Sequence, residues 1–117
     1  MTDADSSHTF TELTERARAV RRLYEERERQ AYGRSWSAEE LMLGFVKDVG
    51  DLAVLVQRAA GIRADAEGEL AHELSDCLWS VIVLADALGC ALEPACLQTM
   101  DELQARLNSN PGSEGEA

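Results

Sequence analysis

Two pairs of acidic residues recur at three-residue spacing in segments that are otherwise apolar. Asp48 and Asp51 interrupt the stretch LMLGFVKDVGDLAVLV, and Glu73 and Asp76 interrupt a second apolar segment. Residues three apart project from one face of a helix, and a buried carboxylate is costly unless positive charge lies beside it. Four carboxylates around one cavity would hold a hard cation, and oxygen-only ligands favour Mg²⁺ or Mn²⁺ over zinc. The alternative is that both pairs lie on solvated helix surfaces.

Helices are the elements that must position these pairs. Ala, Leu, Glu and Arg dominate the composition and β-branched residues are sparse, which predicts an all-α domain. Apolar spacing predicts a first helix over about 9–31, whose opposite face of alternating Arg and Glu is typical of a solvated surface. Ser37 and Glu40 have the spacing of a capping box, so a second helix follows and runs to Ala60, with Gly61 as its C-cap. A third helix over about 67–88 ends at Gly89, and a fourth, with Pro94 at its first position, ends near Leu107.

Short connections between these helices predict one domain with a four-helix bundle-type fold over residues 9–108. Residues 1–8 and 109–117 are polar and are predicted to be disordered. The second helix is apolar nearly all round, which is more than a chain of 117 residues can bury alone. We therefore expect the helices to pack across the interface of a homodimer or a dimer of dimers.

Net charge and hydropathy exclude several classes of partner. The formal net charge of −11 argues against nucleic acid, because phosphate contacts need clustered cations. The longest apolar run, residues 77–85, is too short to span a bilayer, and the N-terminus lacks the apolar core of a signal peptide. The three cysteines show no metal-binding spacing and are expected to be reduced. These features predict a cytoplasmic protein without a membrane partner.

From Trp36 onward the chain resembles the MazG-like, all-α nucleoside triphosphate pyrophosphohydrolases. Their signature is ExxE, a spacer of a dozen to nearly thirty residues, and then ExxD. KDVGDLA stands where the family commonly has EEVGELA, and ELSDCLW stands where it has ELGDVLW, with twenty-one residues between the motifs. The LADALGCALE that follows also matches, and the resemblance covers roughly residues 10–107.

The resemblance implies a reaction and a cofactor. Members of the family hydrolyse a (deoxy)nucleoside triphosphate to the monophosphate and pyrophosphate, with Mg²⁺ as cofactor and Mn²⁺ as a substitute, and nucleotide-pool housecleaning is one expected role. The resemblance assigns Asp48, Asp51, Glu73 and Asp76 as metal ligands, with Asp48 and Glu73 catalytic. The metal would neutralise a substrate that an acidic protein otherwise repels, and would make a bound water a better nucleophile.

Three residues outside the acidic motifs are predicted to bind the substrate. Lys47, the only lysine of the chain, stands where relatives often carry another glutamate. Its ammonium replaces a metal ion, binds a substrate phosphate, or reaches solvent on its long stem and pairs with a nearby acid. Trp36 resembles a family position that lines the nucleobase pocket, and Trp79 lies one turn beyond Asp76 and could border the same pocket; core packing is the alternative for both. Glu69 is a further ligand candidate, and His72 either lies beside the ligands, next to Glu73, or is a surface histidine.

A second departure lies near the C-terminus, where TMDELQARLNSNP replaces the KNxxRYP-like element of many relatives. With Lys47, this departure supports an alternative: a catalytically degenerate relative that binds a nucleotide or a protein partner without hydrolysis. A plain helical oligomerisation module is the third interpretation of the sequence.

Overall fold

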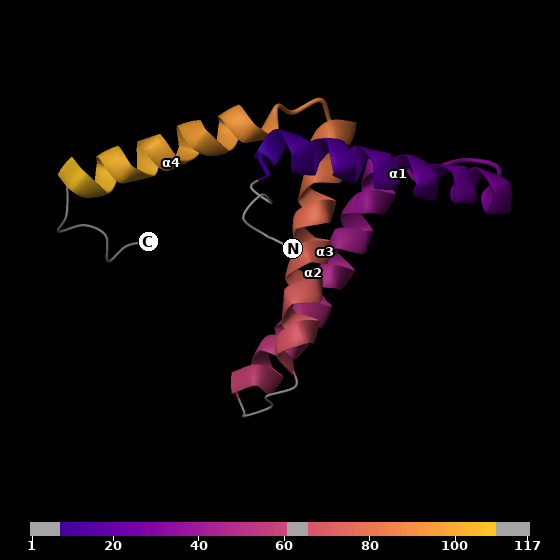
Figure 1. Cartoon of the computed structure of the whole chain (residues 1–117), viewed down its shortest axis with the longest axis horizontal. Helices are drawn as coiled ribbons and strands as arrows, with labels where there is room; N and C mark the ends of the chain where they lie inside the picture. Colours follow the sequence, from indigo (N-terminus) through magenta and orange to yellow (C-terminus); the bar gives the residue numbers. More distant parts are fainter. Residues whose placement is uncertain (1–7, 61–65, 110–117) are drawn as a thin grey trace.

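The computed structural model describes residues 8–60 and 66–109, which form four α-helices and no strand (Figure 1). The helices are α1 (Phe10–Tyr32), α2 (Ala38–Ala60), α3 (Ala66–Ala87) and α4 (Leu92–Ser109). The predicted all-α class is confirmed, and each helix begins and ends within two residues of its expected position. The predicted disorder at 1–7 and 110–117 and the predicted Gly61 cap lie outside the described residues, whereas Ser109, expected in the tail, is helical.

Side-chain caps explain where α1 and α2 begin. At α1, Thr9 Oγ1 accepts the Glu12 amide at 3.1 Å, and the Glu12 carboxylate accepts the Thr9 amide at 2.9 Å. Ser37 and Glu40 exchange the same two bonds at the start of α2, at 3.2 and 2.9 Å. Each capping box satisfies two amides that the first turn leaves without a partner. The box predicted at Ser37 is therefore present.

Two glycines with positive φ end helices. Gly33 (φ 80°) donates its amide to the Arg29 carbonyl at 2.8 Å, and Gly89 (φ 71°) follows α3. This left-handed backbone is strained for residues with a side chain, so glycine is the suitable residue at both points. After Gly89 the chain turns by 110° into α4. Pro94 is the third residue of α4 rather than the first, a position that is tolerated because first-turn amides have no intrahelical partner.

The arrangement is an open one, in which α2 and α3 pack lengthwise as an antiparallel hairpin, α1 crosses it, and α4 projects away (Figure 1). Within the described part of the chain the buried apolar core is small and consists of Ala17, Leu55, Ile82 and Val83. The Cα radius of gyration is 17.9 Å, against about 13 Å for a compact domain of this length. One chain therefore supplies a helical hairpin with two attached helices and does not complete a four-helix bundle by itself.

Within the described ranges no single helix is long and apolar enough to cross a membrane, although α3 and α4 together, as a bent pair, have the length and composition for it.

Candidate functional site

The acidic pairs are positioned by the seam between α2 and α3. On α2, the side chains that turn toward α3 are spaced alternately four and three apart, and Asp48 occupies one of these positions. On α3, Glu73 occupies an equivalent position. This spacing keeps one helix face against its neighbour over several turns. The buried or half-buried members are Leu41, Phe45, Asp48, Leu52 and Leu55 on α2, and Leu70, Glu73, Cys77, Ser80 and Leu84 on α3.

The structure brings three of the four predicted metal ligands into one group. Carboxylate oxygens of Asp48, Asp51 and Glu73 all lie within 4.8 Å of one another across the hairpin. Asp48 and Glu73 are half-buried and Asp51 is exposed. Three carboxylates at this separation repel one another in the absence of a cation, so the group has the charge and the donor atoms of a hard-cation site.

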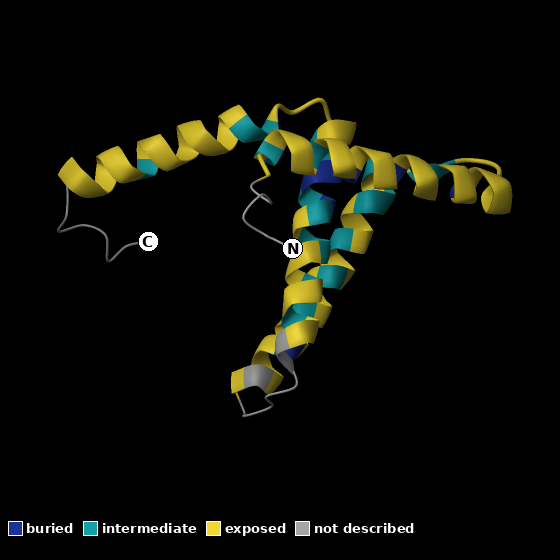
Figure 2. Ribbon diagram, in the orientation of Figure 1, coloured by how far each residue is buried: buried dark blue, intermediate teal, exposed yellow. Residues whose placement is uncertain are grey.

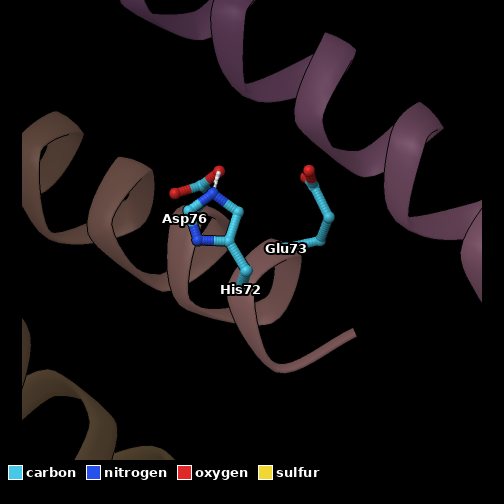
Figure 3. A group of neighbouring side chains, drawn as sticks. All are labelled: His72, Glu73 and Asp76. Carbon is cyan, nitrogen blue, oxygen red and sulfur yellow. Dashed lines mark ion pairs between the residues drawn. The ribbon is translucent and has the colours of Figure 1, made fainter. Parts of the chain in front are cut away.

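Asp76 belongs to a second group, formed with His72 and again with Glu73, whose donor atoms also lie within 4.8 Å of one another. In Figure 3 the imidazole of His72 lies beside the Asp76 carboxylate, with Nε2 3.4 Å from Oδ2, while Glu73 stands apart from that pair. The four predicted carboxylates therefore form two triads that share Glu73, and His72, a weak candidate from sequence, takes part in one of them.

Glu73 also carries an unsatisfied polar atom. Its Oε1 is buried and has no hydrogen-bond partner among the described residues. A buried carboxylate oxygen without a partner is costly, and such atoms are rare in folded proteins. Its position between two groups of acids makes a bound cation the partner that fits it best.

Lys47 lies against this group rather than within it. Its Nζ is 3.0 Å from Asp51 Oδ2, while 76% of its side chain is exposed. The hydrogen bond to Asp51 and the charge of that carboxylate raise the pKa of Lys47, with smaller contributions from Asp48 and Glu73. The ammonium therefore stays protonated and occupies one oxygen of a predicted metal ligand.

Ser80 and Cys77 are seam residues that the sequence did not identify as part of the site. The Ser80 hydroxyl is buried and donates to Asp48 Oδ2 at 3.3 Å, which restrains the orientation of that carboxylate. Burial, followed by the charges of Asp48, Glu73 and Asp76, raises the pKa of the Cys77 thiol. Cys77 thus remains a neutral thiol and offers no thiolate ligand. The seven-residue step from Glu73 to Ser80 was the available sequence signal.

The three predicted substrate-binding residues line one cavity between α1, α2 and α3, with a volume of about 260 Å³. Trp36, Lys47 and Trp79 share it with Asp48. Trp79 packs against Tyr24, with ring centroids 5.7 Å apart, and its Nε1 is buried without a partner among the described residues. An indole that still has a donor to satisfy can pair with a ligand as well as pack.

Trp36 is held in this cavity by a buried ion pair on α1. Arg21 donates two bonds to Glu28, at 2.8 and 3.1 Å, and Glu28 also accepts the Trp36 backbone amide at 2.8 Å. Burial raises the pKa of Glu28, but the bonds from Arg21 and Trp36 outweigh it and the net pKa is lowered. The solvated face predicted for this helix is therefore wrong at Arg21 and Glu28, which are both buried.

Two larger openings reach the acidic groups from solvent. One, of about 570 Å³, is lined by Asp51, Glu69, His72 and Glu73 together with Arg58. The other, of about 640 Å³, lies between α1 and α3 and is lined by Asp48, Asp76 and Trp79 with Arg16 and Tyr24. An arginine borders each opening, so cations are available beside the carboxylates even though the expected C-terminal element is replaced.

Comparison of the chain with protein-family models, with curated proteins and with solved structures finds no match in any of the three. The family resemblance of the two acidic motifs therefore stays a prediction.

Proposed function

We propose that the protein is a Mg²⁺-dependent pyrophosphohydrolase of the MazG-like type, which converts a (deoxy)nucleoside triphosphate to the monophosphate and pyrophosphate in the cytoplasm. The observation that carries this proposal is the Asp48, Asp51 and Glu73 triad, whose oxygens lie within 4.8 Å of one another. Oxygen donors alone suit Mg²⁺ or Mn²⁺. The unpaired, buried Glu73 Oε1 supports the presence of a cation at this point.

The residues present fit the metal that the reaction needs. Asp48, Asp51 and Glu73 would hold one ion, and Asp76 with His72 would complete a second set around Glu73. A bound Mg²⁺ would neutralise the phosphates and make a bound water more acidic.

Other side chains of the site would orient the metal ligands and bind the substrate. Ser80 restrains Asp48, so that its second oxygen is available to the site. Trp36 and Trp79 line a cavity beside Asp48 into which a nucleobase could stack. Arg58 borders the opening next to Asp51 and is placed to bind a phosphate by paired hydrogen bonds.

A pyrophosphate-release assay over a panel of ribo- and deoxyribonucleoside triphosphates, with Mg²⁺ or Mn²⁺, tests the proposal. We expect turnover of at least one nucleotide and a loss of at least about a hundredfold on Asp48→Asn or Glu73→Gln, because each change removes a charged ligand. Asp101→Asn, an exposed carboxylate on α4, is the matched control and should retain wild-type activity. Absence of turnover with every nucleotide and both metals would overturn the proposal, as would wild-type activity in Asp48→Asn.

One observation favours a second function, that of a binding protein without hydrolysis. The ammonium of Lys47 lies 3.0 Å from Asp51 and takes the place of positive charge that a metal would otherwise supply. A chain of this kind would bind a nucleotide in the cavity with Trp36 and Trp79 but would leave the anhydride intact. Binding of a non-hydrolysable triphosphate by calorimetry, with no pyrophosphate release from the natural substrates, is the result expected of this alternative.

A further inference from the structure

The segment His-Glu-Leu-Ser-Asp, residues 72–76, places a nitrogen donor beside the carboxylates that are proposed to hold Mg²⁺. His72 and Asp76 are four residues apart, so their side chains leave the same face of α3. The H-E-x-x-H motif presents its two zinc ligands at this same spacing on a helix. In this chain an aspartate stands at the second ligand position, and aspartate also binds zinc.

The distance between the two donor atoms suits a tetrahedral ion. His72 Nε2 lies 3.4 Å from Asp76 Oδ2 (Figure 3). Two ligands of a tetrahedral zinc ion, with bonds of about 2.1 Å, are about 3.4 Å apart, whereas neighbouring ligands of an octahedral magnesium ion are about 2.9 Å apart. The pair therefore already has the separation that two zinc ligands need.

Glu73 supplies the third donor. One of its carboxylate oxygens lies within 4.8 Å of a donor atom of both His72 and Asp76. In Figure 3 its carboxylate stands apart from the pair, so a rotation of this side chain would bring it to an ion that the other two hold. Its Oε1 is buried without a hydrogen-bond partner among the described residues, and a buried carboxylate oxygen needs one. Three protein ligands and one water complete a four-coordinate zinc site.

This group of donors is open to hydrated ions. The side chains of His72 and Asp76 are 72% and 42% exposed. His72 lines both the opening of about 570 Å³ and the opening of about 640 Å³. The net charge of −11 favours the approach of cations. An ion can therefore reach the three donors without any separation of the helices.

The nitrogen of His72 decides which ion fits. Mg²⁺ takes oxygen ligands and gives up its waters reluctantly, whereas imidazole suits zinc and the neighbouring transition metals. For one set of nitrogen and oxygen ligands, Zn²⁺ binds more tightly than Mn²⁺. The triad of Asp48, Asp51 and Glu73 has oxygen donors only, so the two groups that share Glu73 differ in the ion that they prefer.

We propose that His72, Glu73 and Asp76 form a binding site for Zn²⁺, and that this ion inhibits the Mg²⁺-dependent reaction because it occupies Glu73 and Asp76. The binding of Zn²⁺ stands on the geometry of α3 alone, whereas the inhibition rests on the proposed function. Since both groups use Glu73, each ion should weaken the binding of the other by the same factor.

The two histidines of the chain provide the first test and its control. His8 also has an acid four residues on, with Nδ1 3.6 Å from Glu12 Oε1, but it belongs to no group of three donors among the described residues. In NMR spectra of the full chain, Zn²⁺ should shift the imidazole signals of His72 and leave those of His8 in place. Equal shifts at both histidines, or no shift at His72, would overturn the inference.

Calorimetry with Zn²⁺ measures the affinity of the site. We expect a wild-type dissociation constant of about 10 µM or lower, at least about tenfold weaker binding in His72→Gln, and no change in His8→Gln. His72 is exposed, so His72→Gln should keep the helical circular dichroism of the wild type. About a hundredfold excess of Mg²⁺ should leave most of the zinc bound, because Mg²⁺ disfavours a nitrogen ligand. Equal affinity for Zn²⁺ in the three proteins would contradict the role of His72.

Pyrophosphate release in excess Mg²⁺ tests the inhibition. Free Zn²⁺ at about ten times its dissociation constant should lower the wild-type rate about tenfold, since about 90% of the sites are then occupied. His72→Gln should keep more than half of its own rate without zinc. Equal inhibition of both proteins would overturn the inhibition and leave the proposed function intact. Absence of turnover would overturn both of these, whereas the two binding measurements would still decide the zinc site.

Discussion

At the scale of single residues, Lys47 pairs with a carboxylate that the proposed divalent cation would also need. The Lys47 ammonium lies 3.0 Å from Asp51 Oδ2, and the hydrogen bond between them keeps the lysine pKa raised. Replacing Lys47 by glutamate removes this competitor and adds a further carboxylate beside the triad. We expect Lys47→Glu to bind Mn²⁺ at least about tenfold more tightly than the wild type in calorimetry.

Lys47→Met provides the control for this prediction, because it removes the ammonium and adds no ligand. Its Mn²⁺ affinity should lie between those of the wild type and Lys47→Glu. If the glutamate variant gains pyrophosphohydrolase activity that the wild type lacks, the binding function is favoured over hydrolysis. Equal Mn²⁺ affinity in all three proteins would contradict the assignment of Asp51 as a ligand.

A second residue-scale prediction concerns the buried pair of Arg21 and Glu28. Glu28→Gln removes the charge that balances Arg21, and breaking a buried pair from one side typically costs about 3 kcal/mol or more. The free energy of unfolding, measured with urea, should fall by that order. Arg21→Met/Glu28→Leu should cost less than Glu28→Gln, since it leaves no uncompensated charge.

An exposed pair on the same helix is the control for this change. Glu26 lies 3.5 Å from Arg29 at the surface, and Glu26→Gln should alter stability by less than about 0.5 kcal/mol. A similar loss of stability in Glu26→Gln and Glu28→Gln would show that burial of the Arg21 pair contributes nothing. The segment around Trp36 that joins α1 to α2 should also become more mobile in Glu28→Gln, because the Trp36 amide loses a charged acceptor.

At the scale of elements, the start of α2 is held by Glu40. Bonds from Arg34, then from the Ser37 amide, lower the pKa of Glu40 from 4.5 to about 2. A carboxyl whose folded-state pKa is lowered adds stability above its unfolded pKa, and that stability is lost as pH falls through the folded value. The melting temperature of Glu40→Gln should thus lie below that of the wild type at neutral pH, and the difference should disappear between pH 4.5 and about 2. An equal difference at neutral pH and near pH 2 would contradict this assignment.

Local signals in the sequence were enough to predict the elements and the pairing of the acids. The Ser37–Glu40 box and Gly89 are short-range features that determine the ends of helices with little help from the rest of the fold. Three-residue spacing correctly placed Asp48 and Asp51 on one side of α2, within reach of Glu73. Spacing alone could not predict that the acids divide into two triads, because this division depends on how α3 is rotated about its own axis.

Longer-range features escaped prediction for a different reason. In the sequence, Arg21 and Glu28 look like members of a solvated helix face. The residues that bury them are distant along the chain: Trp36, before α2, and the side chains of α3 that line the same cavity. The direction of α4 was not predicted either. Gly89 marks the end of α3 but does not set the direction of the next helix, and α4 makes few contacts with the hairpin. Tertiary packing decided both outcomes, and single-sequence patterns report it only indirectly.

At the scale of the whole molecule, the question is how a chain with so small a core stays folded. Among the described residues, only Ala17, Leu55, Ile82 and Val83 form a buried apolar core, and exposed residues predominate along the ribbon (Figure 2). Large apolar side chains on all four helices are exposed. A domain of this length that buries so little apolar surface has little to set against the conformational entropy of its helices. Association of two copies, as the sequence predicts, would supply the missing burial, and we therefore expect folding and association to be coupled.

Coupled folding and association makes thermal stability depend on protein concentration. For a dimer that unfolds to two chains, mass action favours the folded state as concentration rises. Between about 1 µM and about 100 µM the melting temperature, followed by circular dichroism at 222 nm, should rise on the order of 5 °C. A melting temperature that is independent of concentration in the wild type would mean that the single chain is stable with its exposed apolar side chains in water, and the coupling of folding to association would be wrong.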